Sequence, residues 1–312
     1  MTMYTIEPER RTLHGKFSRE HEPVLTIEPG DTVRFRTLDA GWGLEAHDPS
    51  GAVPRRTFEP FVPETDSGHA LCGPVFIRGA EPGMALEVHI DHLRSGAYGW
   101  TVAGGWRSVT NERLGVADGA QHYLYWTLDP DAMTGRDQYG HTVTLRPFMG
   151  VMGLPPDEPG LHDTAPPRFC GGNIDCKELI QGTSLYLPIT VPGALFSTGD
   201  GHGAQGDGEA GGTAIECPME VAELTFHLHP TMRLTTPRAR TDEGWLTFGF
   251  HESLDEAMSI ALDAMLGLMG EQHGLSRRDA LAMASVVVDL RVTQVVNGVR
   301  GVHAVLPHGA LR

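Results

Sequence analysis

The apolar segments of this chain are short, because glycine and proline interrupt them along most of its length. The 312 residues include 39 Gly and 22 Pro, about a fifth of the total. Such frequent turn residues are typical of a mainly β protein. Pro-Gly pairs at 29–30, 82–83 and 192–193 each precede an apolar segment. Proline presets φ and glycine accepts positive φ, so we expect each pair to form a turn that starts a strand.

The C-terminal quarter follows a helical pattern. Ser253 and Ser276 each begin a capping box followed by apolar residues at helical spacing, and Gly274 offers a stop between them. We therefore expect two helices within 253–288. Four methionines in this region could line an adaptable binding groove, but packing in a core is the commoner role and makes the helical pair structural.

After the helices, residues 290–296 and 299–306 flank the turn Asn297-Gly298 and predict a β-hairpin. Strands, then two helices, then strands indicate an α+β fold that is predominantly β, with the helices on one sheet face. We expect a single unit over 1–312, β-rich over 1–250, with an α/β portion over 251–312 packed on it.

The charge of the chain restricts its partners. Twenty-four Lys and Arg stand against 40 Asp and Glu, a net charge of −16. This excess repels phosphate backbones and anionic lipids, so we expect neither nucleic acid nor membrane as a partner and favour a small neutral molecule. No stretch of about 18 apolar residues and no N-terminal apolar signal region occurs, so the prediction is a cytoplasmic protein.

The cysteines show no metal-binding or disulfide spacing. We interpret them as reduced cytosolic thiols, with a catalytic cysteine as the weaker alternative. They are Cys72, Cys170, Cys176 and Cys217.

Residues 199–212 are the segment most suggestive of chemistry. Seven of the fourteen are Gly, and ordering so flexible a chain costs entropy that some contact must offset. A divalent cation is a natural source of that contact, because donor side chains lie between the glycines. These side chains are Asp200, His202, Gln205, Asp207 and Glu209.

Asp200 and His202 are two residues apart, so in an extended backbone both side chains project to one side, where one metal can bind both. Glu216 follows in a predicted strand and could complete the three ligands usual for catalytic zinc. Asp175, after the pair Gly171-Gly172, is either a fourth ligand or an orienting group.

Other interpretations of these residues remain open. The segment could be a solvated loop whose carboxylates cap turns, or the calcium-holding loop of a non-catalytic β binding module, although His202 argues against a calcium site. The alternating His227 and His229 could also be ligands, but no carboxylate flanks them in sequence. A second alternating set, formed by Glu87, His89 and Asp91, is better explained as a solvated strand face.

The motifs taken together resemble the acetamidase/formamidase family. Residues 199–209 resemble its signature, and residues 171–175 are similar to a second hallmark upstream. Two departures, Cys72 where Thr is expected and Met84 where Asp is more usual, leave the substrate preference open. Further similar blocks span 23–42, 73–83, 147–153 and 289–297.

The resemblance implies a β-sandwich or barrel-like fold, a homodimer and a divalent metal, usually zinc and sometimes calcium alongside. It also implies hydrolysis of formamide or acetamide to a carboxylate and ammonia. We expect a bound metal to activate water and polarise the amide carbonyl. The expected metal ligands are Asp200 and His202 first, then Glu216 and Asp175. We expect Glu209 to be the general acid/base. A lactamase or another amidase on the same scaffold is the alternative, and no substrate-binding residue is identified.

Overall fold

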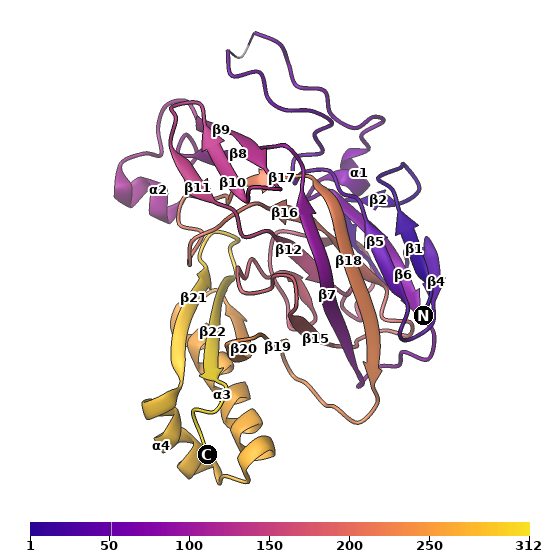
Figure 1. Ribbon diagram of the computed structural model, residues 1–312, viewed down its shortest axis with the longest axis vertical. Helices are drawn as coiled ribbons and strands as arrows, with labels where there is room; N and C mark the ends of the chain where they lie inside the picture. The colour runs from indigo at the N-terminus through magenta and orange to yellow at the C-terminus, as the bar shows by residue number, and fades with distance from the viewer. Residues whose placement is uncertain (51) are drawn as a thin grey trace.

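The computed structural model describes residues 1–50 and 52–312. Strands account for 38% and helices for 13%, so the prediction of a predominantly β, α+β fold is confirmed (Figure 1). The first large sheet has the strand order β1 (Met3–Ile6), β5 (Thr32–Phe35), β18 (Met219–His229), β7 (Ala85–Ser95), β15 (Ser184–Pro188), β19 (Arg238–Arg240), β20 (Gly244–His251), β22 (Arg300–Pro307) and β21 (Asp289–Gln294).

The second large sheet contains the strands that carry most of the candidate site. It has the order β11 (Thr142–Thr144), β10 (Thr134–Asp137), β9 (His122–Asp129), β8 (Tyr98–Ala103), β17 (Glu216–Cys217), β16 (Phe196–His202), β12 (Phe148–Gly153) and β14 (Gly171–Asn173). Three more strands extend it from β16, namely β6 (Leu71–Ile77), β2 (Leu13–His14) and β4 (Leu25–Ile27). A separate pair joins β3 (Lys16–Phe17) to β13 (His162–Asp163).

The two large sheets pack on one another through a shared apolar core. The ring of Phe196, from the second sheet, lies 6.3 Å from that of Phe35 and 5.0 Å from that of Phe226, both from the first sheet. All three side chains are fully buried. Burial of each contributes about 1.5 to 3 kcal/mol, so this contact helps to hold the sheets together. Neither strand order closes on itself, which makes the arrangement a sandwich and not a barrel.

The predicted Pro-Gly turns are present. Gly30, Gly83 and Gly193 have φ values of +93°, +86° and +76°, and each turn leads into a strand. These φ values are costly for residues with a Cβ, which explains why glycine occupies all three positions.

The predicted helical pair is also present. It consists of α3 (Leu254–His273) and α4 (Arg277–Val287), and Gly274 ends α3 with a left-handed φ of 66°. The Ser276 side chain accepts a hydrogen bond from the Asp279 backbone N–H, as the capping box predicts. Ser253 occupies the N-cap of α3, but its hydroxyl makes no capping bond there. Two short helices, α1 (Pro63–Asp66) and α2 (Val109–Leu114), precede this pair.

Helix α3 packs against β20 and β22. A Cβ on Gly249 of β20 would lie 1.9 Å from the Ala257 carbonyl oxygen, so glycine is required for this close approach. The Thr247 hydroxyl donates a hydrogen bond of 2.7 Å to the Ala261 carbonyl. Met265 and Met269 are fully buried in this contact, which agrees with a core role for the methionines.

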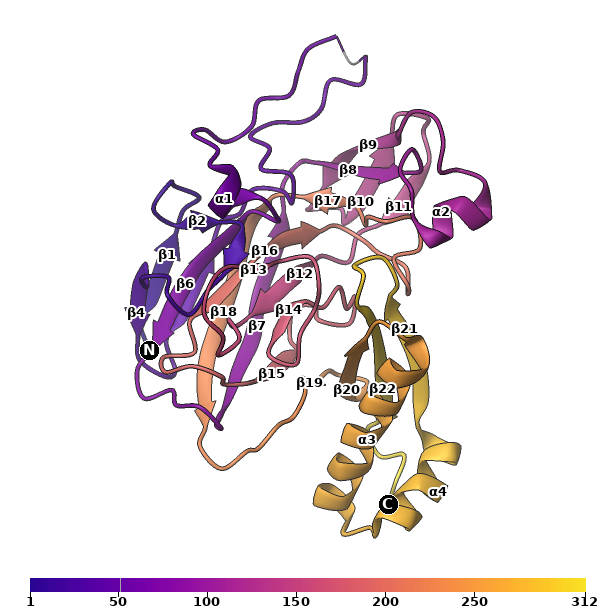
Figure 2. The same cartoon turned by 180° about the vertical axis from the view of Figure 1, so that it is seen from behind.

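The C-terminal hairpin belongs to the first sheet. Strands β21 and β22 pair antiparallel around the Asn297-Gly298 turn, and β22 also pairs with β20 along its whole length. We propose on this basis that residues 1–312 form one unit in which 251–312 pack on 1–250. In both views the turn end of the hairpin points toward β12 and β16, whereas α3 and α4 lie at its other end (Figures 1 and 2). Among the described residues, no helix is both long enough and apolar enough to cross a membrane.

Candidate metal centre

The five predicted site residues lie together in the structure. Asp175 follows β14, Asp200 and His202 are in β16, Glu209 is in the glycine-rich loop, and Glu216 is in β17. Each is between 1% and 6% exposed. Possible ligand atoms of Asp175, Asp200 and His202 lie within 4.8 Å of one another, and so do those of His202, Glu209 and Glu216. His202 is therefore shared by two overlapping groups of donors.

Asp200 and His202 lie close together as expected, but the backbone at Asp200 is not extended as the prediction assumed. His202 Nε2 lies 3.3 Å from Asp200 Oδ1, as the i, i+2 spacing predicts. However, Asp200 has a φ of 59°, so β16 is not regularly extended there. Asp175 and Glu209 also have positive φ values, 51° and 47°. Such conformations cost about 1 to 3 kcal/mol each for residues other than glycine, and the cost is concentrated at this site.

Gly150 of β12 makes room for the cluster. Its neighbours Met149 and Val151 pair with Gly201 and Gly199, which places Gly150 opposite Asp200. A Cβ on Gly150 would lie 2.5 Å from Asp200 Oδ2, 2.7 Å from Asp175 Oδ1 and 2.9 Å from His202 Cε1. The Gly150 carbonyl also accepts a hydrogen bond of 3.2 Å from the Asp175 N–H. Sequence reasoning missed this residue, although it lies in a block that resembles the family.

Two amide side chains orient the cluster. Gln205 Oε1 accepts a hydrogen bond of 3.0 Å from His202 Nδ1, and Gln205 Nε2 donates to the Asp175 carbonyl at 2.7 Å. This leaves His202 Nε2 facing Asp200 and Glu216, as a ligating imidazole requires. Asn297, in the turn of the C-terminal hairpin, donates from Nδ2 to Asp175 Oδ2 at 2.6 Å. Neither amide was predicted to orient a ligand.

The carboxylates have spare acceptor atoms that fit a cation. One oxygen each of Asp175, Asp200, Glu209 and Glu216 is buried and accepts no hydrogen bond from any described residue. Glu216 Oε1 accepts from the Ala214 N–H at 3.0 Å, whereas its Oε2 lies 3.2 Å from His202 Nε2. Buried anionic oxygens without partners are costly, and a divalent ion would compensate them. The donor set, four carboxylates and one imidazole nitrogen, suits such an ion.

Burial and mutual repulsion shift the pKa values of these groups. Burial raises the pKa of Asp175 to about 6 and that of Glu216 to about 7, although the His202 charge opposes both shifts. Burial, and then the Asp175 charge, raises the pKa of Glu209 well above its ordinary value. Burial alone would lower the pKa of His202, but the Glu216 and Asp200 carboxylates raise it well above its ordinary value. Such strongly perturbed groups are typical of functional sites.

Asp207 does not belong to the cluster, although it was expected among the donors of the glycine-rich segment. Its carboxylate lies 2.6 Å from Arg291 Nη2 and 3.1 Å from Lys177 Nζ. The side chain points outward because the loop turns between Gln205 and Glu209, and two cations satisfy it there.

His69 is a second histidine close to the site, and no sequence motif singled it out. It is partly buried next to β6, and its Nδ1 shares a hydrogen bond of 2.9 Å with the Thr164 hydroxyl. Its neighbour Leu71 pairs with Gly199 of β16, and only this strand pairing brings it to the cluster.

A cavity of about 570 Å³ is lined in part by the end of the glycine-rich loop. Residues 210–212, which follow Glu209, form part of its wall, and residues on both sides of Asn297 form another part. Trp106 and Leu114 add apolar surface, and Arg113 and Arg300 add positive charge. Glu209 and Asn297 themselves are not among its lining residues, although their neighbours in the two loops are.

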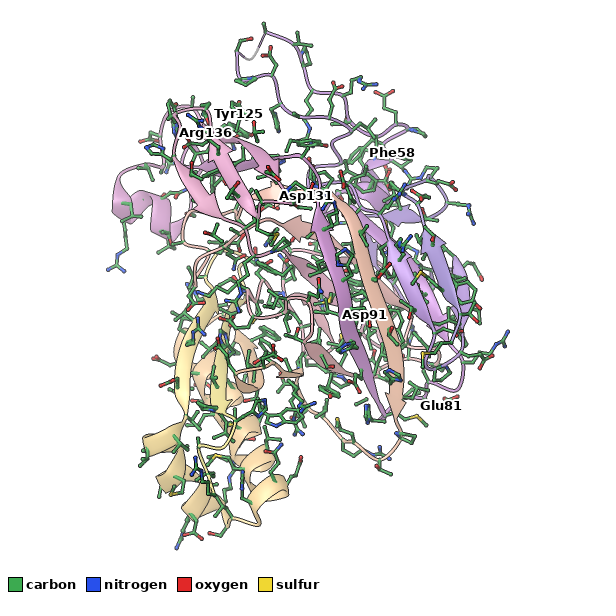
Figure 3. All side chains as sticks on the ribbon, viewed as in Figure 1. Phe58, Glu81, Asp91, Tyr125, Asp131 and Arg136 are labelled. Atoms are coloured by element: carbon green, nitrogen blue, oxygen red, sulfur yellow. The ribbon has the colours of Figure 1, made fainter. Side chains whose placement is uncertain are left out.

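The other polar candidates do not join the cluster. His229 Nε2 lies 2.6 Å from Glu87 Oε2. Asp91 lies on β7 (Figure 3), and its carboxylate accepts a hydrogen bond of 2.7 Å from the Thr225 hydroxyl. The four cysteines are buried and unpaired. Burial raises the pKa of Cys72 and of Cys170 to about 12, which argues against a thiolate nucleophile at either position.

Comparison with known proteins assigns the chain to a family. The family described as "Acetamidase/Formamidase family" matches residues 3–163 and 160–235. A protein of Schizosaccharomyces pombe named "Putative formamidase" is 25% identical in an alignment 274 positions long, which covers 68% of this chain and 65% of that protein. The chain thus spans less than two thirds of the length of that relative.

Two solved structures share the fold. An acetamidase from Yersinia enterocolitica is 27% identical with a TM-score of 0.84, and the alignment covers 99% of this chain and 93% of that one. A gamma lactamase from Delftia acidovorans has a TM-score of 0.61 at 18% identity, with 97% and 92% covered, and shares the fold alone. The chain belongs to the acetamidase/formamidase family.

Proposed function

We propose that this protein hydrolyses the C–N bond of a small neutral aliphatic amide such as formamide or acetamide, with a divalent metal at the His202 cluster. The observation that carries the proposal is the set of four buried carboxylates with unpartnered oxygens around one imidazole. In a chain of this family, that arrangement favours metal-assisted amide hydrolysis.

Asp200, His202, Glu216 and Asp175 would hold the metal. The imidazole nitrogen favours zinc over calcium, because calcium prefers oxygen ligands alone. When bound, the ion would polarise the amide carbonyl and lower the pKa of water at the site. Gln205 keeps the proton of His202 on Nδ1, and Asn297 holds one oxygen of Asp175, so both ligands are oriented before substrate arrives.

Glu209 would carry the proton in this reaction. The water oxygen bonds to the carbonyl carbon, the C–N bond breaks, and the proton passes to the departing nitrogen. The products are a carboxylate and ammonia, which takes up the remaining proton as ammonium.

The proposal also includes a cytoplasmic location, a homodimer and a neutral substrate. Four unpaired, buried cysteines suit a reducing compartment, which supports a cytoplasmic location. Homodimer formation rests on the family resemblance. The excess of negative charge favours a neutral substrate over an anionic one.

A coupled ammonia assay across formamide, acetamide, propionamide, urea and a γ-lactam tests this function. We expect ammonia from the short aliphatic amides, slower turnover as the acyl chain lengthens, loss of activity with a chelator and recovery with zinc. Activity on the lactam alone would transfer the assignment to a lactamase. Metal-loaded protein inactive on the whole panel would instead favour a non-catalytic, cation-stabilised binding module.

A further inference from the structure

A second group of buried donor side chains includes Cys176, the residue that follows Asp175 of the first group. Glu178 is two residues further along the chain, and His303 lies in β22 of the C-terminal hairpin. Their possible ligand atoms all lie within 4.8 Å of one another. Cys176 and His303 are fully buried, and Glu178 is nearly so. Two distant parts of the chain thus contribute one thiol, one carboxylate and one imidazole to a single point.

His303 is the residue of this group whose bonding is incomplete. Its Nδ1 shares a hydrogen bond of 2.8 Å with the Thr293 hydroxyl, which fixes the ring. Its Nε2 points to Glu178 Oε2 at 3.8 Å and has no hydrogen-bond partner among the described residues. Burial also lowers the pKa of His303 to about 4, so the ring is neutral near pH 7 and its free nitrogen can act as a ligand.

Glu178 uses its two oxygens for different partners. Oε1 lies 2.8 Å from Arg291 Nη1, whereas Oε2 accepts a hydrogen bond of 3.2 Å from Cys176 Sγ. A carboxylate that ligates a metal through one oxygen is commonly held by a donor on the other, and Arg291 has that position here.

An ion-pair network is the simplest alternative explanation. Arg291 and Lys177 balance the charges of Glu178 and Asp207, so neither carboxylate needs a metal. This network, however, leaves His303 Nε2 buried without a partner in the described part of the chain, and an unsatisfied buried nitrogen is unfavourable. Cys176 Sγ and Glu178 Oε2 face the same point as that nitrogen, and the ion pairs do not explain why three donor types meet there.

We propose that Cys176, Glu178 and His303 bind a zinc ion, separate from any metal at the His202 cluster. On binding, the Cys176 thiol would lose its proton to solvent, and a water molecule could complete a four-coordinate set. A sulfur, a nitrogen and an oxygen donor together favour zinc or cobalt over calcium or magnesium. The ion would tie the segment after Asp175 to β22, and so hold the hairpin turn that carries Asn297 against the candidate active site.

Cobalt substitution of the full chain tests this site independently of amidase activity. The His202 cluster contains no sulfur, so a thiolate-to-cobalt charge-transfer band in the near ultraviolet can come only from a site that includes cysteine. We expect the wild-type protein to show this band, and Cys176→Ser to lose it together with one metal ion per chain. Cys170→Ser, which removes another buried cysteine outside the group, should retain the band and the ion.

Three results would overturn the proposal: no thiolate band in cobalt-loaded wild-type protein, a band that persists in Cys176→Ser, or an unchanged zinc content in His303→Gln. The first measurement uses only the wild-type protein and therefore does not depend on whether a variant folds. If the proposed amidase function failed, the band would still appear, so the two proposals are tested separately.

Discussion

The β-rich part over 1–250 and the C-terminal part over 251–312 contribute to the candidate active site in different ways. The β-rich part provides all five titratable residues of the cluster, and three of them have positive φ values. The C-terminal part provides no titratable residue to it. Instead it supplies Asn297, whose amide holds Asp175, and the Thr293 carbonyl, which accepts a hydrogen bond of 3.0 Å from the Gly208 N–H.

The β-rich part therefore supplies the groups that would carry out the chemistry, and the C-terminal part supplies hydrogen bonds that support them. The strained, charged side chains lie where strands β12, β16 and β17 meet, and they need a surrounding structure that holds them in place. Within the C-terminal part, the hairpin turn reaches the cluster while α3 and α4 pack at the opposite end (Figure 2). We therefore expect the functional effect of substitutions to fall from β16 to the hairpin and then to the helices.

Replacement of His202 or Asp200, two of the proposed metal ligands, should have the largest effect on metal binding and turnover. We expect His202→Ala and Asp200→Ala to lose the metal ion of the His202 cluster and to reduce amide turnover to the background of the assay, because each removes a proposed ligand of that ion. Metal analysis and the ammonia assay measure both effects. Asp207→Asn is the matched control from the same segment, and it should keep its metal. Full metal occupancy in a folded His202→Ala protein would contradict the assignment.

Glu209→Gln should separate proton transfer from metal binding. The substitution keeps the shape of the side chain but removes its ability to carry a proton, so turnover should fall strongly while the metal content stays the same. Steady-state kinetics and metal analysis on one preparation distinguish the two. Loss of the metal would instead make Glu209 a ligand, and the β-rich part would then have no identified proton carrier.

Gly150→Ala should disrupt the cluster without removing any donor. The new methyl group would meet Asp200 and Asp175 at less than 3 Å, so the carboxylates would have to shift. We expect metal affinity to fall by at least about tenfold, within the range seen when the residues supporting a metal site are changed. Gly206→Ala is the control, because a Cβ there meets no atom within 4 Å. Equal behaviour of the two variants would show that the space at Gly150 is not needed.

Asn297→Ala should show how far the C-terminal part supports the site. Removal of the amide frees Asp175 Oδ2, and we expect a loss of about tenfold in metal affinity or turnover. Leu290→Ala, at an exposed position of the same hairpin, is the control. If Asn297→Ala matched wild-type protein in both measurements, the Asn297 amide would have no supporting role at the site.

Leu266→Ala should have the smallest effect on turnover. Leu266 is buried in α3, so its truncation should lower the free energy of unfolding by about 2 to 5 kcal/mol. The kcat of the folded protein should hardly change, because α3 packs on β20 and β22 and contributes nothing to the cluster. Denaturant unfolding and kinetics at a temperature where the variant is folded provide the measurements. A large fall in kcat with unchanged stability would show that the helices shape the active site.

Local sequence patterns determined several strand starts, the helical pair, the C-terminal hairpin and part of the candidate site. Pro-Gly pairs predicted strand starts, capping residues predicted α3 and α4, and Asn297-Gly298 predicted the hairpin, because each depends only on the conformational preferences of neighbouring residues. The donors Asp200, His202 and Glu209 could likewise be selected, since polar ligands concentrated in a glycine-rich segment form a local signal.

Only the tertiary structure decided how these pieces meet. The pairing of β12 with β16 places Gly150 opposite Asp200, and the hairpin brings Asn297 to Asp175 across 122 residues of chain. The same folding sets His303 next to Cys176. Such contacts depend on strand register and sheet order, which result from the packing of the whole core, and no short segment carries that information.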